Sequence, residues 1–294
     1  RMKIEGKLSY SLNCIIDFDN LDSVYLSSSL ENKGIKIINY GKAFLPILND
    51  TFTYDAYDKD VLMKKIKISE TNPDYVKLEN ISHYLKYSVL TSEDGSFYYH
   101  KGFNEQAISQ AIGENIRKKR FARGGSTITM QLVKNVFLNK NKTISRKLEE
   151  IFLTWLIENL HVVSKDRIFE VYLNVIEWGP NVYGIKEASW FYFKKRPADL
   201  NLKESIFLAS IIPSPKYYRF SFEQNGKLKD CFLNYFKRVA EIMTRRNQIS
   251  PSDTIGLSLD IELKGEGKKL LLSKDTTANE SETLDLFLNN DDEN

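Results

Sequence analysis

The chain has 294 residues, of which 42% are hydrophobic and 28% charged, and its formal net charge is +3. This composition indicates a globular protein with one sizeable domain and smaller attachments, and the small net charge gives no support to a nucleic-acid-binding protein. The two cysteines, Cys14 and Cys231, fit neither a metal motif nor a disulfide framework, so we interpret both as buried thiols.

No run of about eighteen apolar residues is present, so the sequence predicts no membrane-spanning helix. It contains no signal peptide. The chain begins Arg1-Met2, and we expect it to be a piece of a longer protein. The lack of a predicted membrane-spanning helix in this sequence is therefore only weak evidence against a membrane anchor in the longer protein.

The chain divides by pattern into three segments. Residues 1–74 are predicted to be rich in strands, because "LDSVYLSSSL" and "KGIKIINYG" alternate polar and apolar residues or carry β-branched runs, and Pro73 marks the expected boundary. Residues 75–248 have helical periodicity. Residues 249–294 are acidic and polar and expected to be mobile, with "GLSLDIELKG" as a candidate strand.

Several stretches of the middle segment have helical apolar spacing. Their predicted buried faces are Ala107, Ile108, Ala111, Ile112 and Ile116; Leu148, Ile151, Phe152 and Trp155; and Ile168, Val171, Tyr172 and Val175. Ser164 is the expected N-cap of the third of these helices. Asn201 with Glu204 predicts a capping box at a further helix, which Pro213 should end.

The stretch "LTSEDGSFYYHKGF", residues 90–103, contains the first candidate for chemistry. Glu93 could be a catalytic carboxylate. Ser, Asp and Gly are also ordinary turn residues, so these residues alone favour an ordinary polar turn over a catalytic site.

A second candidate is "GGSTITMQLVKN", residues 124–135, where two glycines precede Ser126, Thr127 and a predicted helix. Backbone N–H groups at a helix start can bind an anion, although ordinary Ser/Thr capping explains the same pattern. The surrounding charge favours the anion site, because between Glu114 and Lys147 only Glu114 is acidic. A phosphorylated substrate or a membrane surface would fit such a field. The basic residues are Arg117, Lys118, Lys119, Arg120, Arg123, Lys134, Lys140, Lys142, Arg146 and Lys147.

A third candidate is "SRKLEEIF", in which Arg146 and Glu150 share one side of a helix, opposite the predicted buried stripe. They form either a surface i,i+4 pair of about 0.2–0.5 kcal/mol or a cation and a carboxylate that face one cleft.

Together these stretches resemble the peptidoglycan glycosyltransferases, glycosyltransferase family 51. The family's Glu-Asp-x-x-Phe-x-x-His-x-Gly, Gly-Gly-Ser-Thr-Ile-Thr-Gln-Gln-Leu-x-Lys-Asn, Arg-Lys-x-x-Glu and Lys-x-x-Ile-Leu-x-x-Tyr-Leu-Asn are matched in order. The matching residues are Glu93, Asp94, Phe97, His100 and Gly102; Gly124 to Asn135; Arg146, Lys147 and Glu150; and Lys165, Ile168, Tyr172, Leu173 and Asn174. The chain departs from the family at Met130 (usually Gln), Phe169 (Leu) and Lys194 (Gly).

The resemblance implies a mainly α, lysozyme-like, two-lobed helical domain, here preceded by a small β-rich segment. It implies polymerisation of lipid II by inverting glycosyl transfer, with polyprenyl diphosphate as leaving group. By position Glu93 is the general base, and Glu150 is a second carboxylate that orients Arg146 or holds a divalent ion. The implied substrate-binding residues are Asp94, Phe97, His100, Ser126, Thr127, Gln131, Lys134, Asn135 and Arg146, with a structural role equally open for His100.

The implied partners are lipid II, the growing glycan chain, anionic membrane lipids and other cell-wall synthesis proteins, without nucleic acid. The place of action is the outer face of the bacterial cytoplasmic membrane, where "RKKRFAR" with Ile112, Ile116 and Phe121 would meet the lipid surface. The sequence shows no protein metal site and implies no organic cofactor; Mg²⁺ or Mn²⁺ would be shared with the substrate diphosphate. Two alternatives are a lysozyme-like hydrolase and a catalytically idle scaffold in cell-wall assembly.

Overall fold

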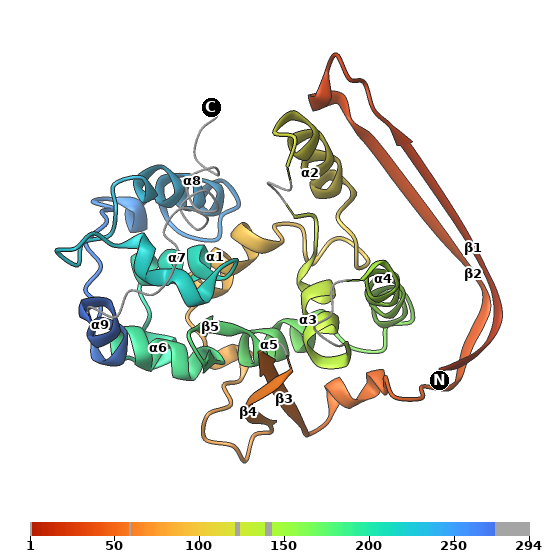
Figure 1. Ribbon diagram of the computed structural model, residues 1–294, viewed down its shortest axis with the longest axis horizontal. Helices are drawn as coiled ribbons and strands as arrows, with labels where there is room; N and C mark the ends of the chain where they lie inside the picture. Colours follow the sequence, from red (N-terminus) through yellow and green to blue (C-terminus); the bar gives the residue numbers. More distant parts are fainter. Residues whose placement is uncertain (1, 59, 121–123, 139–142, 274–294) are drawn as a thin grey trace. The chain divides into compact units, whose positions relative to one another are not determined.

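The computed structural model describes residues 2–58, 60–120, 124–138 and 143–273. Over these residues the protein is mainly helical, with small two-stranded antiparallel sheets and strands in the N-terminal part, which confirms the predicted fold class (Figure 1). The chain forms two compact units, residues 1–51 with 96–165 and residues 52–95 with 166–294. The segment boundaries at residues 74 and 249 stay predictions.

The first unit begins with a long hairpin of two strands, β1 (Lys3–Ile15) and β2 (Tyr25–Asn39). Helix α2 (Glu105–Arg117) packs against β2. Both the backbone N–H and the hydroxyl of Ser28 donate to Glu105 Oε1, at 2.6 and 2.7 Å. Gly113 allows a close approach, because a Cβ there would lie 2.4 Å from the carbonyl oxygen of Leu21. The hairpin is therefore docked on α2 through β2 and through the short helix Leu21–Ser23 that joins the two strands.

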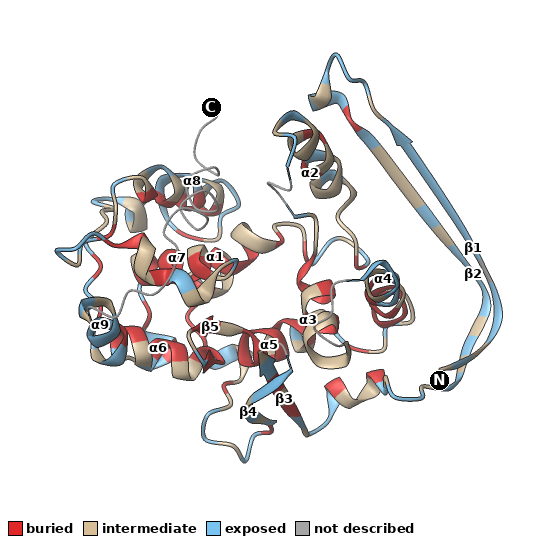
Figure 2. Ribbon diagram, viewed as in Figure 1, coloured by how far each residue is buried: buried red, intermediate tan, exposed pale blue. Residues whose placement is uncertain are grey.

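The hairpin leaves much of its surface open, and Figure 2 shows it mostly exposed or half-buried. A ribbon of only two strands has little to cover its faces. Cys14 on β1 is exposed, and Cys231 in the second unit is half-buried. The prediction of two buried thiols was therefore wrong for both.

The remaining helices of the first unit are α3 (Ile128–Phe137) and α4 (Ile144–Asn159), which pack on each other. The predicted apolar stripe of α4 is wrong in its first half, where Leu148 is 61% and Ile151 36% exposed, while Glu150 on the opposite side is buried. A helical wheel treats a helix as uniform along its axis. Here residues 153–158 are buried on every side, and the first two turns are covered only beside Glu150.

The second unit contains most of the helical core. Its strands are β3 (Phe52–Asp58), β4 (Val61–Ile68), β5 (Glu177–Gly179) and β6 (Val182–Tyr183). Its α-helices are α1 (His83–Glu93), α5 (Lys165–Val175, with Lys165 counted in the first unit), α6 (Ile185–Phe193), α7 (Leu202–Ile211), α8 (Phe232–Arg245) and α9 (Gly265–Leu272). Short 3-10 helices lie at Leu78–Asn80, Pro197–Asp199, Pro215–Ser221 and Pro251–Thr254 here, and at Leu21–Ser23 and Leu45–Asn49 in the first unit.

Local signals at several helices were read correctly. The predicted face of α5, from Ile168 to Val175, is fully buried, and α5 begins directly after Ser164. Asn201 and Glu204 form the predicted capping box of α7, which ends just before Pro213. Lys194, at the family's Gly position, caps α6 in a left-handed conformation (φ 55°), which is the geometry that usually selects Gly.

The candidate strand in "GLSLDIELKG" is wrong. Residues 257–264 have no regular secondary structure, with Ile261 and Leu263 buried and Asp260 and Glu262 exposed, and no strand pairs with them among the described residues. The alternation reflects one face packed on the second unit's core. The acidic residues 274–294 lie outside the described residues.

A polar clamp on α5 holds the segment that leads into α1. Asn174 accepts from the N–H of Val76 at 2.9 Å and donates to its carbonyl at 2.8 Å. One turn earlier, Glu170 accepts from the N–H of Leu78 at 2.7 Å and from the hydroxyl of Tyr75. This clamp therefore fixes the segment before α1, and the last residue of α1 is Glu93, the predicted general base.

We expect Glu170→Gln to destabilise the fold in a pH-dependent way. Burial alone would raise the pKa of Glu170, but hydrogen bonds from Tyr75, Leu78 and Arg167 hold it below its ordinary 4.5. A lowered folded-state pKa gives stability that is complete above 4.5 and lost as the pH falls through the folded value. Urea unfolding should show a loss of roughly 1.5–3 kcal/mol at about pH 7 that shrinks as the pH falls below 4.5. A pH-independent difference would contradict this.

Candidate active site

The predicted site residues are divided between the two units. Glu93 and Asp94 belong to the second unit, and all other predicted site residues belong to the first. Their roles in substrate contact stay predictions.

Glu93 is the last residue of α1 and is partly exposed, while Asp94 caps the helix and is 4% exposed. Behind them lies Tyr172 of α5, fully buried. Burial raises the pKa of the Tyr172 phenol well above its ordinary value, and the negative charges of Glu93 and Asp94 raise it further. The phenol therefore stays protonated beside the two carboxylates. Ser92 shares a 2.7 Å hydrogen bond with Tyr235, which helps to fix the end of α1.

In the first unit, the loop after residue 95 is tied to the start of α3. Gly102, at φ +96°, donates its N–H to His100 Nδ1 at 3.1 Å, so His100 bonds its own loop. Thr127 donates to the carbonyl of Gly102 at 2.7 Å and accepts from the N–H of Met130 as N-cap of α3. With Thr127 only 2% exposed, its hydroxyl joins the loop to the helix.

A buried ion pair lies beneath the same loop. Glu158 of α4 is 6% exposed and accepts from the hydroxyl of Thr129 and, at 2.7 Å, from Lys165 Nζ. The same ammonium lies 4.4 Å from the ring centroid of Phe97. Phe97 is 1% exposed, so its ring is buried. We therefore propose that Phe97 anchors the loop rather than contacting substrate directly.

Glu158→Ala should strongly destabilise the protein. Removing the carboxylate leaves Lys165 charged, largely buried and without this partner, and breaking such a pair costs about 3–5 kcal/mol. Denaturant unfolding measures this. Glu266→Ala is the matched control, because Glu266 pairs with Lys269 at the same 2.7 Å distance but at the surface, and we expect no measurable change. Equal stability of the two variants would contradict the buried-pair interpretation.

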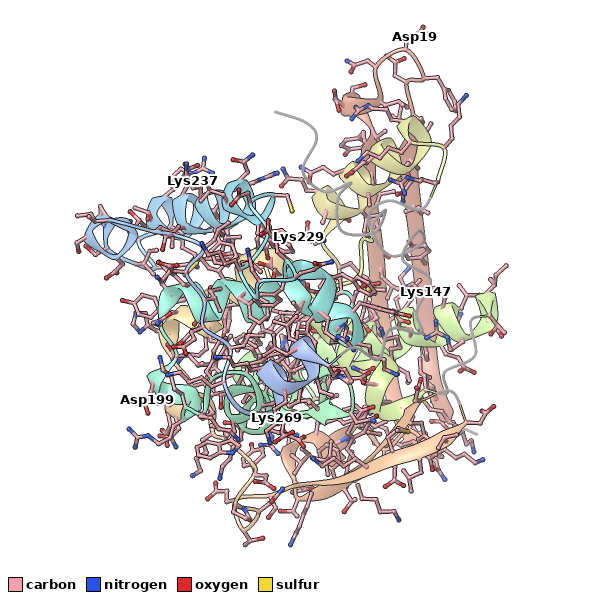
Figure 3. The ribbon with its side chains drawn as sticks, turned by 60° about the vertical axis from the view of Figure 1, so that its left-hand side comes forward. Asp19, Lys147, Asp199, Lys229, Lys237 and Lys269 are labelled. Atoms are coloured by element: carbon pink, nitrogen blue, oxygen red, sulfur yellow. The ribbon has the colours of Figure 1, made fainter. Side chains whose placement is uncertain are left out.

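Glu150 joins the second and third predicted motifs. It is 2% exposed, and its oxygens contact Lys147 Nζ at 2.6 Å and Arg146 Nη1 at 3.3 Å. Lys147, labelled on α4 in Figure 3, also donates to the hydroxyl of Ser126 at 3.0 Å. Within the described residues, the buried Nε of Arg146 has no hydrogen-bond partner. Two cations are thus held around one buried carboxylate, and one of them keeps an unused donor.

The rest of α3 presents a polar face. Gln131, Lys134 and Asn135 are partly exposed. Met130, where the family usually has Gln, is 4% exposed, so its side chain lies in the core. The substitution therefore removes no amide from the exposed face, and it gives little support to the idea of an inactive relative.

The acidic residues of this site do not fit a protein-held metal ion. Both oxygens of Glu150 already contact cations, and no group of three or more His, Cys, Asp or Glu in the described part of the chain could hold a metal. Of the two roles predicted for Glu150, the contacts favour orienting Arg146.

The basic stretch is only partly visible. Arg117 pairs with Asp22, and Lys118 with Glu114 at 3.1 Å, while Lys119 and Arg120 are exposed. The remaining members, Arg123, Lys140 and Lys142, lie outside the described residues, as does Phe121.

Sequence reasoning missed Thr129, Glu158 and the roles of Lys147, Lys165 and Tyr172. Three of them could have been identified from the sequence, because Lys147, Lys165 and Tyr172 are part of the family motifs quoted above. Thr129 is also in a motif, but nothing in the pattern pairs it with Glu158.

A helical protein with a carboxylate at a helix end and cations gathered on a second, buried carboxylate has the groups needed for transfer from an anionic donor. The sequence profile described as "Transglycosylase" matches residues 59–244, which is more than half of the chain. The chain belongs to the transglycosylase family, and the resemblance inferred from the motifs is confirmed.

Individual relatives agree with this assignment. The biosynthetic peptidoglycan transglycosylase of Methylobacillus flagellatus is 40% identical over 182 residues, covering 60% of this chain and 79% of that protein. The protein of the same name from Dechloromonas aromatica is 43% identical over 157 residues, covering 53% and 67%. That of Nitrosomonas eutropha is 45% identical over 144 residues, covering 49% and 58%.

Proposed function

We propose that this chain polymerises lipid II into glycan strands during bacterial cell-wall synthesis. The growing chain, linked to a polyprenyl diphosphate, is the donor, and a sugar hydroxyl of the incoming lipid II attacks with inversion. The observation that carries this proposal is the transglycosylase match over residues 59–244 in a chain that retains Glu93, Lys134, Arg146 and Glu150. The relatives are named biosynthetic peptidoglycan transglycosylases, which supports synthesis of glycan over its degradation.

In this mechanism Glu93 is the general base. A sugar hydroxyl is a poor nucleophile at neutral pH, and a positioned carboxylate that accepts its proton as the new bond forms increases the rate by about 10²–10⁴. The position of Glu93 at the end of a clamped helix, partly exposed, suits this role. The buried phenol of Tyr172 behind it stays neutral and does not compete for the proton.

Lys134 and Arg146 meet the charge that grows on the departing diphosphate. Each charge-assisted hydrogen bond of this kind contributes roughly 1.5–3 kcal/mol. Glu150 holds Arg146 in place, so the guanidinium is oriented before substrate arrives. Ser126, Gln131 and Asn135 complete the proposed donor site.

We include in the proposal a Mg²⁺ or Mn²⁺ ion that travels with the substrate and is held by its diphosphate oxygens. No protein residue is assigned as its ligand, and the ion would add to the charge stabilisation that Lys134 and Arg146 supply. A fall in rate on adding a chelator, reversed by either ion, is the expected result.

The proposed place of action is the outer surface of the bacterial cytoplasmic membrane. Among the described residues, no helix has the length and apolarity needed to cross a bilayer. The first unit does present apolar side chains beside basic ones. Ile112 and Ile116 of α2 are half-buried, Lys119 and Arg120 just after α2 are exposed, and Ile144 of α4 is 83% exposed. Such a mixture suits anionic lipid headgroups, where the lipid-linked substrate resides.

The alternatives receive less support. A glycan hydrolase with a neutral leaving group needs a proton donor, and the cations around Glu150 have no task in that reaction. An idle scaffold would have no need of the retained charged residues.

Incubation of the chain with lipid II, in detergent and in anionic liposomes, tests the proposal. Polymeric glycan that a muramidase digests is the expected product. Absence of polymer under both conditions would favour the scaffold, and degradation of preformed glycan would favour the hydrolase.

A further inference from the structure

The second unit contains a cavity of about 490 Å³ that none of the predicted site residues lines. It is bounded by the consecutive residues Lys64 to Ile68 of β4, by the segment around Tyr75, and by α6 through Lys186, Glu187 and Trp190. A cavity of this size falls in the range of ligand-binding sites.

The cavity follows the free edge of a strand. Successive side chains of a strand point to opposite faces, so a cavity that all five residues line runs along the strand's edge. The other edge of β4 is occupied by β3, with Phe52 opposite Ile68 and Asp55 opposite Lys65. Within the described ranges no further strand pairs with β4.

The backbone groups of Lys65 on this edge are available for pairing, whereas the carbonyl of Lys67 is already bonded. Asn72 Nδ2 donates to the carbonyl of Lys67 at 2.6 Å, which shows that this carbonyl points away from β3. Because alternate residues of an antiparallel strand share a direction, the N–H and carbonyl of Lys65 point the same way. Exposed edge groups of this kind are templates for an added strand.

The side chains give the edge a positive charge. Lys64 is neutralised by Glu187 at 2.6 Å, and Lys186 lies 4.0 Å from Asp74. Lys65 and Lys67 are both exposed, and neither has a carboxylate partner in the described part of the chain. The groove therefore has a basic outer rim that an acidic ligand would complement.

An aromatic side chain lies at the same groove. Trp190 is 56% exposed, an unusual state for so large an apolar group, and Ile66 beside it is half-buried. An exposed Trp in a groove is a typical anchor for a partner's apolar side chain. This groove, formed by the cavity along the edge of β4, combines backbone donors and acceptors, cations and an apolar contact. Together these features favour an extended peptide over a small anion as the ligand.

We propose that this groove binds an extended, acidic peptide segment of a partner protein, which adds to β4 as a third strand. Ladder hydrogen bonds at Lys65 hold the backbone, acidic side chains face Lys65 and Lys67, and an apolar side chain rests on Trp190. This site is separate from the proposed polymerase chemistry.

A fluorescein-labelled peptide of about twelve residues, alternating Asp and Val, is the probe, titrated against the full chain by fluorescence anisotropy. The double variant Lys65→Glu/Lys67→Glu should weaken binding by at least about tenfold. Lys33→Glu/Lys36→Glu is the matched control, because it makes the same charge change at exposed lysines of β2 in the other unit. It should change binding by less than about twofold. Both double variants should polymerise lipid II as the wild type does, so failure of this proposal and failure of the proposed function are distinguishable.

Hydrogen exchange locates the peptide. Binding should protect the Lys65 amide and leave that of Ile66, already directed at β3, unchanged. Equal weakening by both double variants, or equal binding of a Lys-Val peptide or of an N-methylated Asp-Val peptide, would overturn the proposal. Protection of the Lys65 amide in the free chain would also overturn it, because the edge would already be paired.

Discussion

Glu93→Gln should yield a folded protein that makes no detectable glycan polymer from lipid II. The amide has nearly the same shape as the carboxylate but cannot accept the proton of the attacking hydroxyl, so we expect a loss of about 10²–10⁴ in rate. Continuous polymerisation assays with lipid II measure it. Thermal unfolding of the variant should match the wild type, because Glu93 is partly exposed at the end of α1 and its removal takes a negative charge away from Asp94.

Glu79→Gln serves as the control for this experiment, because Glu79 is an exposed carboxylate of the same unit. Its activity should equal that of the wild type. Full activity in Glu93→Gln would remove the assignment of the base, and the buried Asp94 would then be the next carboxylate to replace.

Features set by neighbours in sequence were predictable. The capping box of α7 needs only Asn201 and Glu204, which are three residues apart, and both were identified. The buried face of α5 was also correct, because that helix is enclosed by the second unit's core along its length and its apolar period matches its burial. Four ordered motifs identified the family for the same reason, since each is a local pattern.

Features set by distant contacts were not predictable. Leu148 and Ile151 were predicted as core residues from the helical wheel but are 61% and 36% exposed, because none of the described residues covers the first turns of α4 on that side. Residues 257–264 alternate like a strand but find no strand to pair with. The bond between Thr129 and Glu158 joins two helices, and no spacing rule connects them.

The candidate site contains both a feature that was predictable from the sequence and one that was not. The sequence placed Arg146 and Glu150 on one side of α4, which is correct, and left a weak surface pair as one interpretation. Burial decides against that interpretation, since Glu150 is 2% exposed and holds Lys147 as well. A surface pair of about 0.2–0.5 kcal/mol would tolerate loss of its carboxylate, whereas a buried one would not.

Glu150→Gln should therefore lower the polymerisation rate by at least about 10²-fold, because two charge-assisted contacts of roughly 1.5–3 kcal/mol each lose their anion and Arg146 is no longer held for the diphosphate. The kinetic measurement is kcat/KM for lipid II. Glu149→Gln is the matched control, since it is the same change one residue away at an exposed position of the same helix. Its rate should be unchanged.

A double-mutant cycle with Arg146→Gln separates the two roles considered for Glu150. If Glu150 acts by orienting Arg146, both substitutions remove the same contribution to the rate. The double variant should then be about as slow as the slower single variant. If Glu150 acts independently, for instance by holding a divalent ion, the two losses should multiply and added Mn²⁺ should partly restore Glu150→Gln. The 3.3 Å contact to Arg146 and the 2.6 Å contact to Lys147 leave neither carboxylate oxygen free of a cation, so we expect the first result.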